Sequence, residues 1–183
     1  STIGLVGMNE CCLNFLGCSI GDDEGADFTR RVLLHMAEKI KDFQEETGHI
    51  YNLEATPAEG TSFRLAKIDR KLYPEIVCAG SGTPYYTNST ALPVGYTDDI
   101  FEALGKQEPL QRIYSGGTVF HSFIGERIED PELVANLVKR IATNYHIPYF
   151  TLTPSFSICP VHGYIPGAHE ECPLEKEAAE WEQ

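Results

Sequence analysis

Short apolar runs alternate with longer stretches of helical periodicity along this chain. The runs IGLVGMN, IYNLE, GGTVFHSFIGE and YFTLTPSF have the length and composition of buried strands. Strands that alternate with helices form β-α-β units, and the strands of such units pair in parallel. The sequence therefore predicts an α/β fold, either as an open sheet or as one piece of a larger barrel, because so few strands cannot close a barrel alone.

The helical stretches carry apolar stripes and recognisable ends. Apolar residues recur at helical spacing from Phe28 to Phe43, and this helix is expected to end near Gly48. Pro131 begins a second striped stretch, PELVANLVKRIATNY. Thr97 is expected to cap a short helix over DDIFEAL.

Charge and composition exclude several functions. The net charge is −13, from 27 acidic and 14 basic residues, so the surface repels phosphate backbones and direct nucleic-acid binding is not expected. No run approaches the roughly 18 apolar residues of a membrane span, and the first residues lack the basic region and small-residue cleavage site of a signal peptide, so they are not expected to be one. We expect a cytoplasmic protein with reduced cysteines, and, since the chain begins without Met, a processed or cut polypeptide.

The stretch ATPAEGTSFR has the features of an anion site at a helix start. Pro57 suits the first helical turn, Gly60 allows close approach, and two hydroxyls follow it. Unpaired N–H groups and the positive end of the helix dipole can hold phosphate without a lysine. The alternative is an ordinary capped helix start. The candidate substrate-binding residues are Thr56, Pro57, Ala58, Glu59, Gly60, Thr61 and Ser62.

Asn9 and Glu10 follow the first apolar run, where α/β proteins place ligand groups. Glu10 is a candidate general base and Asn9 a candidate hydrogen-bond donor, with burial in the core as the alternative. The neighbouring Cys11, Cys12 and Cys18 are either redox thiols or small packing residues. Elsewhere, Tyr85 and Tyr86 either stack on a base or pack, and Gly116 and Gly117 either admit a ligand or form a turn.

Near the C-terminus, CPVHGYIPGAHEECPLE has part of a zinc-knuckle pattern. Cys159 and His162 stand at the spacing by which one turn presents two zinc ligands. Cys172 is a third candidate, and His169 or Glu175 would have to complete the tetrahedron. A second closely spaced cysteine pair is missing, so spacing alone leaves a zinc site and a plain turn both open.

Four long motifs resemble the anaerobic (class III) ribonucleoside-triphosphate reductases. They are YNLEATPAEGTSFRLAK, YYTNSTALPVGYTDDIFEAL, YSGGTVFHSFIGE and YFTLTPSFSICPVHGYIPG, and they occur in the family's order over almost the whole chain. The resemblance implies one half of the ten-stranded α/β barrel of glycyl-radical enzymes, spanning residues 1–155, followed by a partial zinc-binding module and truncated tail at 156–183.

The resemblance also implies roles for particular residues. VGMN resembles the strand that places an asparagine against the substrate ribose, so Asn9 takes that role and Glu10 is a candidate for proton transfer. TPAEGTS resembles the loop that receives the substrate phosphates, and the knuckle resembles the first part of a cysteine zinc site. For the whole enzyme the resemblance implies a homodimer, nucleotide effectors that regulate it allosterically, and a radical-SAM activating enzyme.

Two family elements are outside this sequence. The final residues EKEAAEWEQ contain no glycine for the glycyl radical, and neither Cys11 nor Cys12 matches the family's radical cysteine. We therefore do not expect this polypeptide to turn over alone. One hypothesis is a segment of an oxygen-sensitive reductase that makes deoxyribonucleoside triphosphates for DNA synthesis; the alternative is a noncatalytic nucleotide-binding or split-chain module. The reductant, formate or a thiol protein, is left open.

Overall fold

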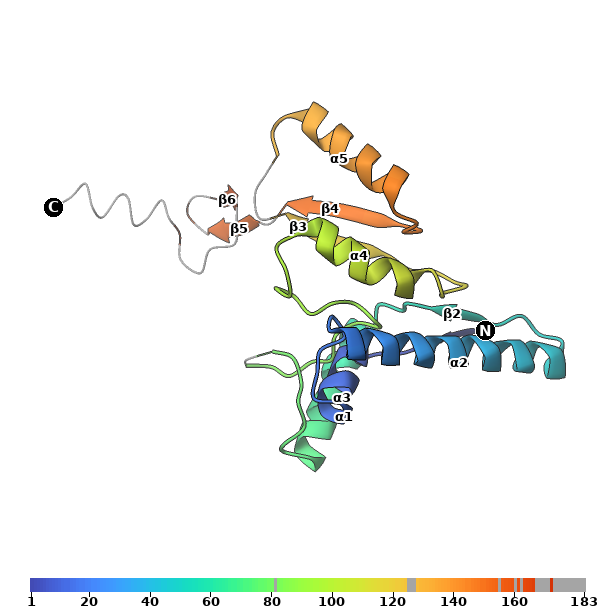
Figure 1. Cartoon of the computed structure of the whole chain (residues 1–183). Helices are drawn as coiled ribbons and strands as arrows, with labels where there is room; N and C mark the ends of the chain where they lie inside the picture. The colour runs from blue at the N-terminus through green and yellow to red at the C-terminus, as the bar shows by residue number, and fades with distance from the viewer. Residues whose placement is uncertain are drawn as a thin grey trace. The chain divides into compact units, whose positions relative to one another are not determined.

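The computed structural model describes residues 1–80, 82–124, 128–154, 156–159, 161, 163–166 and 172 (Figure 1). It confirms the α/β class and most of the predicted alternation. Its contacts divide the chain into two units, residues 1–120 with 145–149 and residues 121–144 with 150–183. The elements are β1 (Thr2–Gly4), α1 (Met8–Phe15), α2 (Asp23–Thr47), β2 (Asn52–Glu54), α3 (Glu59–Leu72), α4 (Ile100–Gln111), β3 (Phe120–Ile124), α5 (Pro131–Asn144), β4 (Phe150–Pro154), β5 (Phe156–Cys159) and β6 (Gly163–Pro166).

In the first unit β1 and β2 pair in parallel, as the alternation predicts, with Ile3 opposite Leu53. The other edge of β2 is taken by the loop at 115–117. The Leu53 N–H donates to Ser115 Oγ at 3.0 Å, and the Gly116 N–H donates to the Leu53 carbonyl at 2.7 Å. Leu53 is fully buried between these two neighbours.

The glycine pair at 116–117 serves this close approach. A Cβ on Gly116 would lie 3.0 Å from both the Leu53 carbonyl oxygen and Asn52 Nδ2. The Ala55 N–H donates to the Gly117 carbonyl at 2.9 Å, which continues the pairing. The close approach that these glycines allow is to β2, a neighbour that neither interpretation of the glycine pair includes.

The predicted stripe from Phe28 to Phe43 lies on α2, which packs against α1, β2 and α4. The helix ends where expected, because Gly48 adopts a left-handed conformation (φ 68°) and its N–H donates to the Gln44 carbonyl at 2.9 Å. The core that α2 covers consists of Met8, Cys12, Ile20, Leu33, Ile40, Leu53, Leu110 and Tyr114.

Two local predictions in the first unit are wrong. The run IGLVGMN is not one strand: β1 ends at Gly4, and Met8 and Asn9 already belong to α1. Thr97 does not cap α4 either. The cap is Asp99, whose Oδ1 accepts from the Phe101 N–H at 2.8 Å, because Asp is as good an N-cap as Thr and stands directly before the helix.

In the second unit β3 and β4 pair and α5 lies between them in the chain. Pro131 begins α5 as predicted, and Ile141 is its buried residue, 1% exposed. The stretch expected to form one strand at 149–156 is two, because β4 ends at Pro154 and β5 begins at Phe156. β5 and β6 form an antiparallel hairpin. None of the helices in the described ranges combines the length and apolar character needed to cross a bilayer.

A glycine in the first turn of α2 offers a test of this packing. A Cβ on Gly25 would overlap the Ser19 carbonyl oxygen and lie 3.2 Å from Ile20 Cα. We predict that Gly25→Ala lowers the free energy of unfolding by about 2–4 kcal/mol, measured by chemical denaturation. The matched control is Gly105→Ala in α4, where a Cβ meets nothing within 4 Å, and this change is expected to stabilise by about 0.5–1 kcal/mol. Equal effects of the two changes would contradict the prediction.

Candidate functional site

The start of α1 is tied to the loop at 86–89 by backbone contacts. The Gly7 N–H donates to the Thr87 carbonyl at 2.8 Å, and the Met8 N–H donates to the Ser89 carbonyl at 3.1 Å. Gly7 is left-handed (φ 79°), and a Cβ there would lie 3.1 Å from the Tyr86 side chain. Only glycine meets both demands, so this residue allows the chain to turn from β1 into α1.

The two candidate catalytic residues lie in the first turn of α1, and both are buried: Asn9 is 3% exposed and Glu10 is 1% exposed. Asn9 Oδ1 accepts from Ser19 Oγ at 3.1 Å and from the Ile20 N–H at 3.2 Å. Asn9 Nδ2 donates to Glu10 Oε1 at 3.2 Å. The structure therefore brings the two residues together and fixes the Asn9 amide from both ends.

Glu10 is held from the other side by Thr87. Its Oε2 accepts from the Thr87 N–H at 2.9 Å, and its Oε1 accepts from Thr87 Oγ1 at 2.7 Å. With the Asn9 amide, three donors surround this buried carboxylate. That number compensates the loss of hydration that burial of a carboxylate would otherwise impose.

The candidate phosphate loop leads into α3, whose N-cap is Ala58. The N-cap residue itself makes no capping hydrogen bond, because alanine has no side-chain acceptor, and the Ala58 N–H is bound from outside the helix by the side chain of Asn88. Gly60 and Thr61 are exposed, Ser62 is buried at 3%, and a Cβ on Gly60 would meet nothing within 4 Å. An exposed, uncapped helix start of this kind can accept an anion.

Residues 87–90, here called the bridge segment, join the two candidate regions. At one end Thr87 binds Glu10, and one residue later Asn88 Oδ1 accepts from the Ala58 N–H at 3.3 Å. The start of α1 and the start of α3 thus contact consecutive residues of one short segment. The stretch YYTNST belongs to one of the family motifs, but sequence reasoning assigned no role to residues 87–90; the signal available was the run Asn-Ser-Thr, which is typical of side chains that bind backbone groups.

An open hollow of about 360 Å³ lies beside α1. Glu10, Cys11 and Tyr86 line it, together with Val6, Gly7, Asn14, Phe15, Asp69 and Ile76. Tyr86 donates its hydroxyl to Asp69 Oδ2 at 2.7 Å. Burial raises the pKa of Tyr86, and the hydrogen bond to Asp69 raises it further. The Tyr86 side chain is therefore held by Asp69 at the edge of the hollow.

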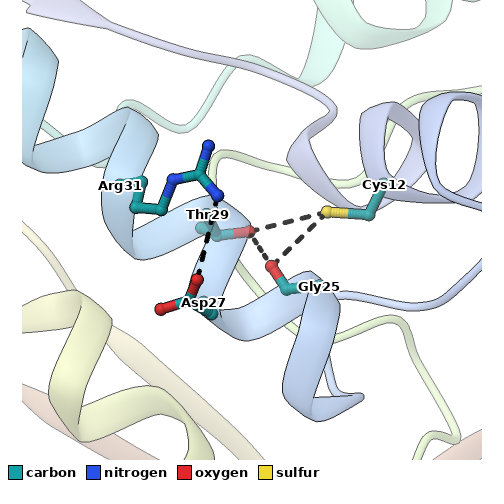
Figure 2. Close-up of polar contacts among 5 residues, drawn as sticks. All are labelled: Cys12, Gly25, Asp27, Thr29 and Arg31. Atoms are coloured by element: carbon teal, nitrogen blue, oxygen red, sulfur yellow. Dashed lines mark hydrogen bonds and ion pairs between the residues drawn. The ribbon is translucent and has the colours of Figure 1, made fainter.

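Cys12 has a packing role in this structure. Its thiol is fully buried, and Figure 2 shows it between two groups of α2, the Gly25 carbonyl at 3.7 Å and Thr29 Oγ1 at 3.6 Å. Thr29 in turn donates to the Gly25 carbonyl at 2.8 Å. Burial raises the pKa of the Cys12 thiol, which disfavours the reactive thiolate. The exposed Cys11, which lines the hollow, is the more accessible of the two.

The backbone around the predicted zinc knuckle is a hairpin. Cys159 is the last residue of β5 and lies opposite Gly163, the first residue of β6. His162, His169 and Glu175 lie outside the described residues, and Cys172 is partly buried. Among the residues that are described, no group of three or more His, Cys, Asp and Glu side chains could hold a metal ion.

The fold is that of the anaerobic ribonucleotide reductases. The chain is similar to the crystal structure of the Thermotoga maritima enzyme with MES in its active site, with a TM-score of 0.71 and 27% identity, covering 95% of this chain and 29% of that one. The chain is also similar to the crystal structure of the same enzyme in complex with dATP and CTP, with a TM-score of 0.69 and 26% identity. This match covers 95% of this chain and 28% of that one.

The family model described as anaerobic ribonucleoside-triphosphate reductase matches residues 1–180, and the chain belongs to this family. The reductase of Enterobacteria phage T4 is 28% identical over 95% of this chain and 26% of its own length. The Haemophilus influenzae reductase is 26% identical over 64% of this chain and 17% of its own. The chain thus spans about a quarter or less of these curated relatives, and the resemblance inferred from the four motifs is confirmed.

The three hydrogen-bond donors around Glu10 lead to a prediction about replacing its carboxylate with an amide. In Glu10→Gln an NH₂ group replaces one acceptor oxygen and faces a donor, Thr87 or Asn9. We expect the free energy of unfolding to fall by about 1–3 kcal/mol, measured by urea denaturation. The exposed Glu46→Gln serves as control and should change it by less than about 0.5 kcal/mol. A Glu10→Gln chain as stable as the unchanged one would show that the donors do not require a carboxylate.

Tyr86 leads to a prediction about alkaline pH. An unfolded tyrosine ionises near pH 10, whereas the raised pKa keeps folded Tyr86 protonated to higher pH. Its contribution to stability is therefore complete below about pH 10 and is lost as the pH rises through the folded-state value. We expect the unchanged chain to lose more unfolding free energy than Tyr86→Phe between pH 9 and 11, relative to their values at pH 7. Parallel stability curves for the two chains would contradict this.

Proposed function

We propose that this chain contributes the substrate contacts of an anaerobic ribonucleoside-triphosphate reductase, which converts ribonucleoside triphosphates to deoxyribonucleoside triphosphates by glycyl and thiyl radical chemistry. The observation that carries the proposal is the bridge segment, because it joins the start of α1, with Asn9 and Glu10, to the start of α3. A nucleotide has a sugar and a phosphate chain only a few bonds apart, so two subsites joined in this way suit it.

In this proposal each subsite has a distinct role. Asn9 directs an amide hydrogen toward a ribose hydroxyl, while its oxygen stays fixed by Ser19 and Ile20. Glu10 accepts or returns a proton beside it. The backbone N–H groups of Glu59, Gly60 and Thr61 bind phosphate oxygens at the positive end of α3, with Thr56, Pro57 and Ala58 forming the approach and the exposed Thr61 hydroxyl adding a donor.

The glycyl radical would supply the one-electron oxidant that starts the reaction. Its glycine and the radical cysteine are not among the residues that match in this sequence, so the part played by residues 1–183 is to bind and orient the substrate and to move a proton. The reduction itself belongs to the complete enzyme.

The remaining proposals come from the family. We place residues 1–155 in one half of the ten-stranded barrel and residues 156–183 in a partial zinc module. In such a module Cys159, the last residue of β5, would be one zinc ligand, and His162 and Cys172 would be two others. Such zinc would be structural. For the complete enzyme we propose a cytoplasmic homodimer that nucleotide effectors regulate and a radical-SAM enzyme activates. No finding favours the noncatalytic alternative.

Charge at the start of α3 tests the phosphate subsite. Gly60→Asp fits the open space there and adds an anion that favours the helix dipole, so stability should rise by about 0.3–1 kcal/mol. The same carboxylate repels phosphate, and we expect the dissociation constant for CTP, measured by isothermal titration calorimetry, to rise about tenfold or more. Gly60→Ala adds no charge and should bind CTP within about twofold of the unchanged chain. Equal affinity for the aspartate and alanine variants would refute phosphate binding at α3.

A further inference from the structure

The bridge segment is held in a conformation that its own residues do not prefer. Ser89 is the one residue other than glycine, among those that the structure describes, with a positive φ, at 46°. It is also buried, at 3% exposed. A non-glycine residue in this region persists only where its surroundings enforce it. Something outside the segment must therefore hold it.

Tyr114 provides that hold. Its hydroxyl lies 2.7 Å from Ser89 Oγ and 2.8 Å from Thr90 Oγ1, so one side chain engages two consecutive residues of the bridge segment. Tyr114 is itself part of the core, 8% exposed. Gln107 adds a second contact from α4, donating its amide to the Thr90 carbonyl at 3.0 Å.

The clamped residues stand immediately beside the ones that contact the two subsites. Ser89 gives its carbonyl to the Met8 N–H, at the start of the helix that carries Asn9 and Glu10. Asn88, one residue earlier, holds the Ala58 N–H at the start of α3. A change in the conformation of the segment would therefore change the spacing between the two helix starts.

We propose that Tyr114 is a positioning residue that sets the spacing between the sugar and phosphate subsites by clamping the bridge segment through Ser89 and Thr90. The inference rests on the proposed function. It makes a distinct claim, that correct spacing, rather than either subsite alone, depends on this hydroxyl. A ligand that spans both subsites gains from their spacing, because binding at one raises the effective concentration at the other. A ligand that occupies one subsite does not.

The experiment compares two probes on the full chain, CTP, which spans both subsites, and inorganic tripolyphosphate, which reaches only the phosphate loop. In Tyr114→Phe we expect the dissociation constant for CTP to rise about tenfold and that for tripolyphosphate to change less than about twofold. Tyr96→Phe is the matched control, because its hydroxyl donates to the Gly21 carbonyl at 3.0 Å, away from the bridge segment. It should leave both constants unchanged.

Ser89→Ala gives a second measure should Tyr114→Phe fail to fold. This variant keeps the contact between Tyr114 and Thr90 and removes the contact between Tyr114 and Ser89. We therefore expect the dissociation constant for CTP to rise about threefold and that for tripolyphosphate to stay unchanged. If the folded variants keep their affinity for CTP, or if both probes lose affinity equally, the inference about Tyr114 is overturned while the proposed function stands. An unchanged chain that binds neither probe would overturn the proposed function, and the inference with it.

Discussion

The arrangement of the first unit depends on one buried carboxylate. Glu10 is almost fully enclosed, and its oxygens are satisfied by the neighbouring Asn9 and by Thr87, which lies 77 positions further along the chain. Removing a carboxylate from water is costly unless donors replace the lost hydration. The loop at 87–90 therefore has to meet α1 at this point. That meeting determines where the start of α3 can lie, because the next residue, Asn88, binds it.

The features that the sequence predicts correctly are those that depend on patterns among residues close together in the chain. The α2 stripe, its end at Gly48, the proline at the start of α5 and the parallel pairing of β1 with β2 all follow from periodicity and from residues with a restricted backbone. The sequence places Asn9 and Glu10 at the end of a strand, because the apolar run continues to Met8. The left-handed Gly7 ends that run, and glycine alone does not reveal which turn it makes.

The parts of the site that sequence reasoning missed depend on distant contacts. Ser89 and Thr90 meet Tyr114 across about two dozen residues, and no spacing rule pairs them. The same limit explains the glycines at 116–117, whose partner strand lies more than sixty positions earlier. The family resemblance assigns a phosphate role and a ribose role to the loop at 56–62 and to Asn9, which the residue patterns alone leave as candidates with a structural alternative.

The pairing of β2 has a consequence for how a larger sheet can be assembled. Parallel strand β1 takes one edge of β2, and the backbone at 115–117 takes the other. Both rows of main-chain donors and acceptors on this strand are thus occupied by this chain. Any strand supplied by another part of the polypeptide must therefore pair with the outer side of β1 or with the outer side of residues 115–117. β2 is thus an interior strand of the sheet, however many strands the complete sheet contains.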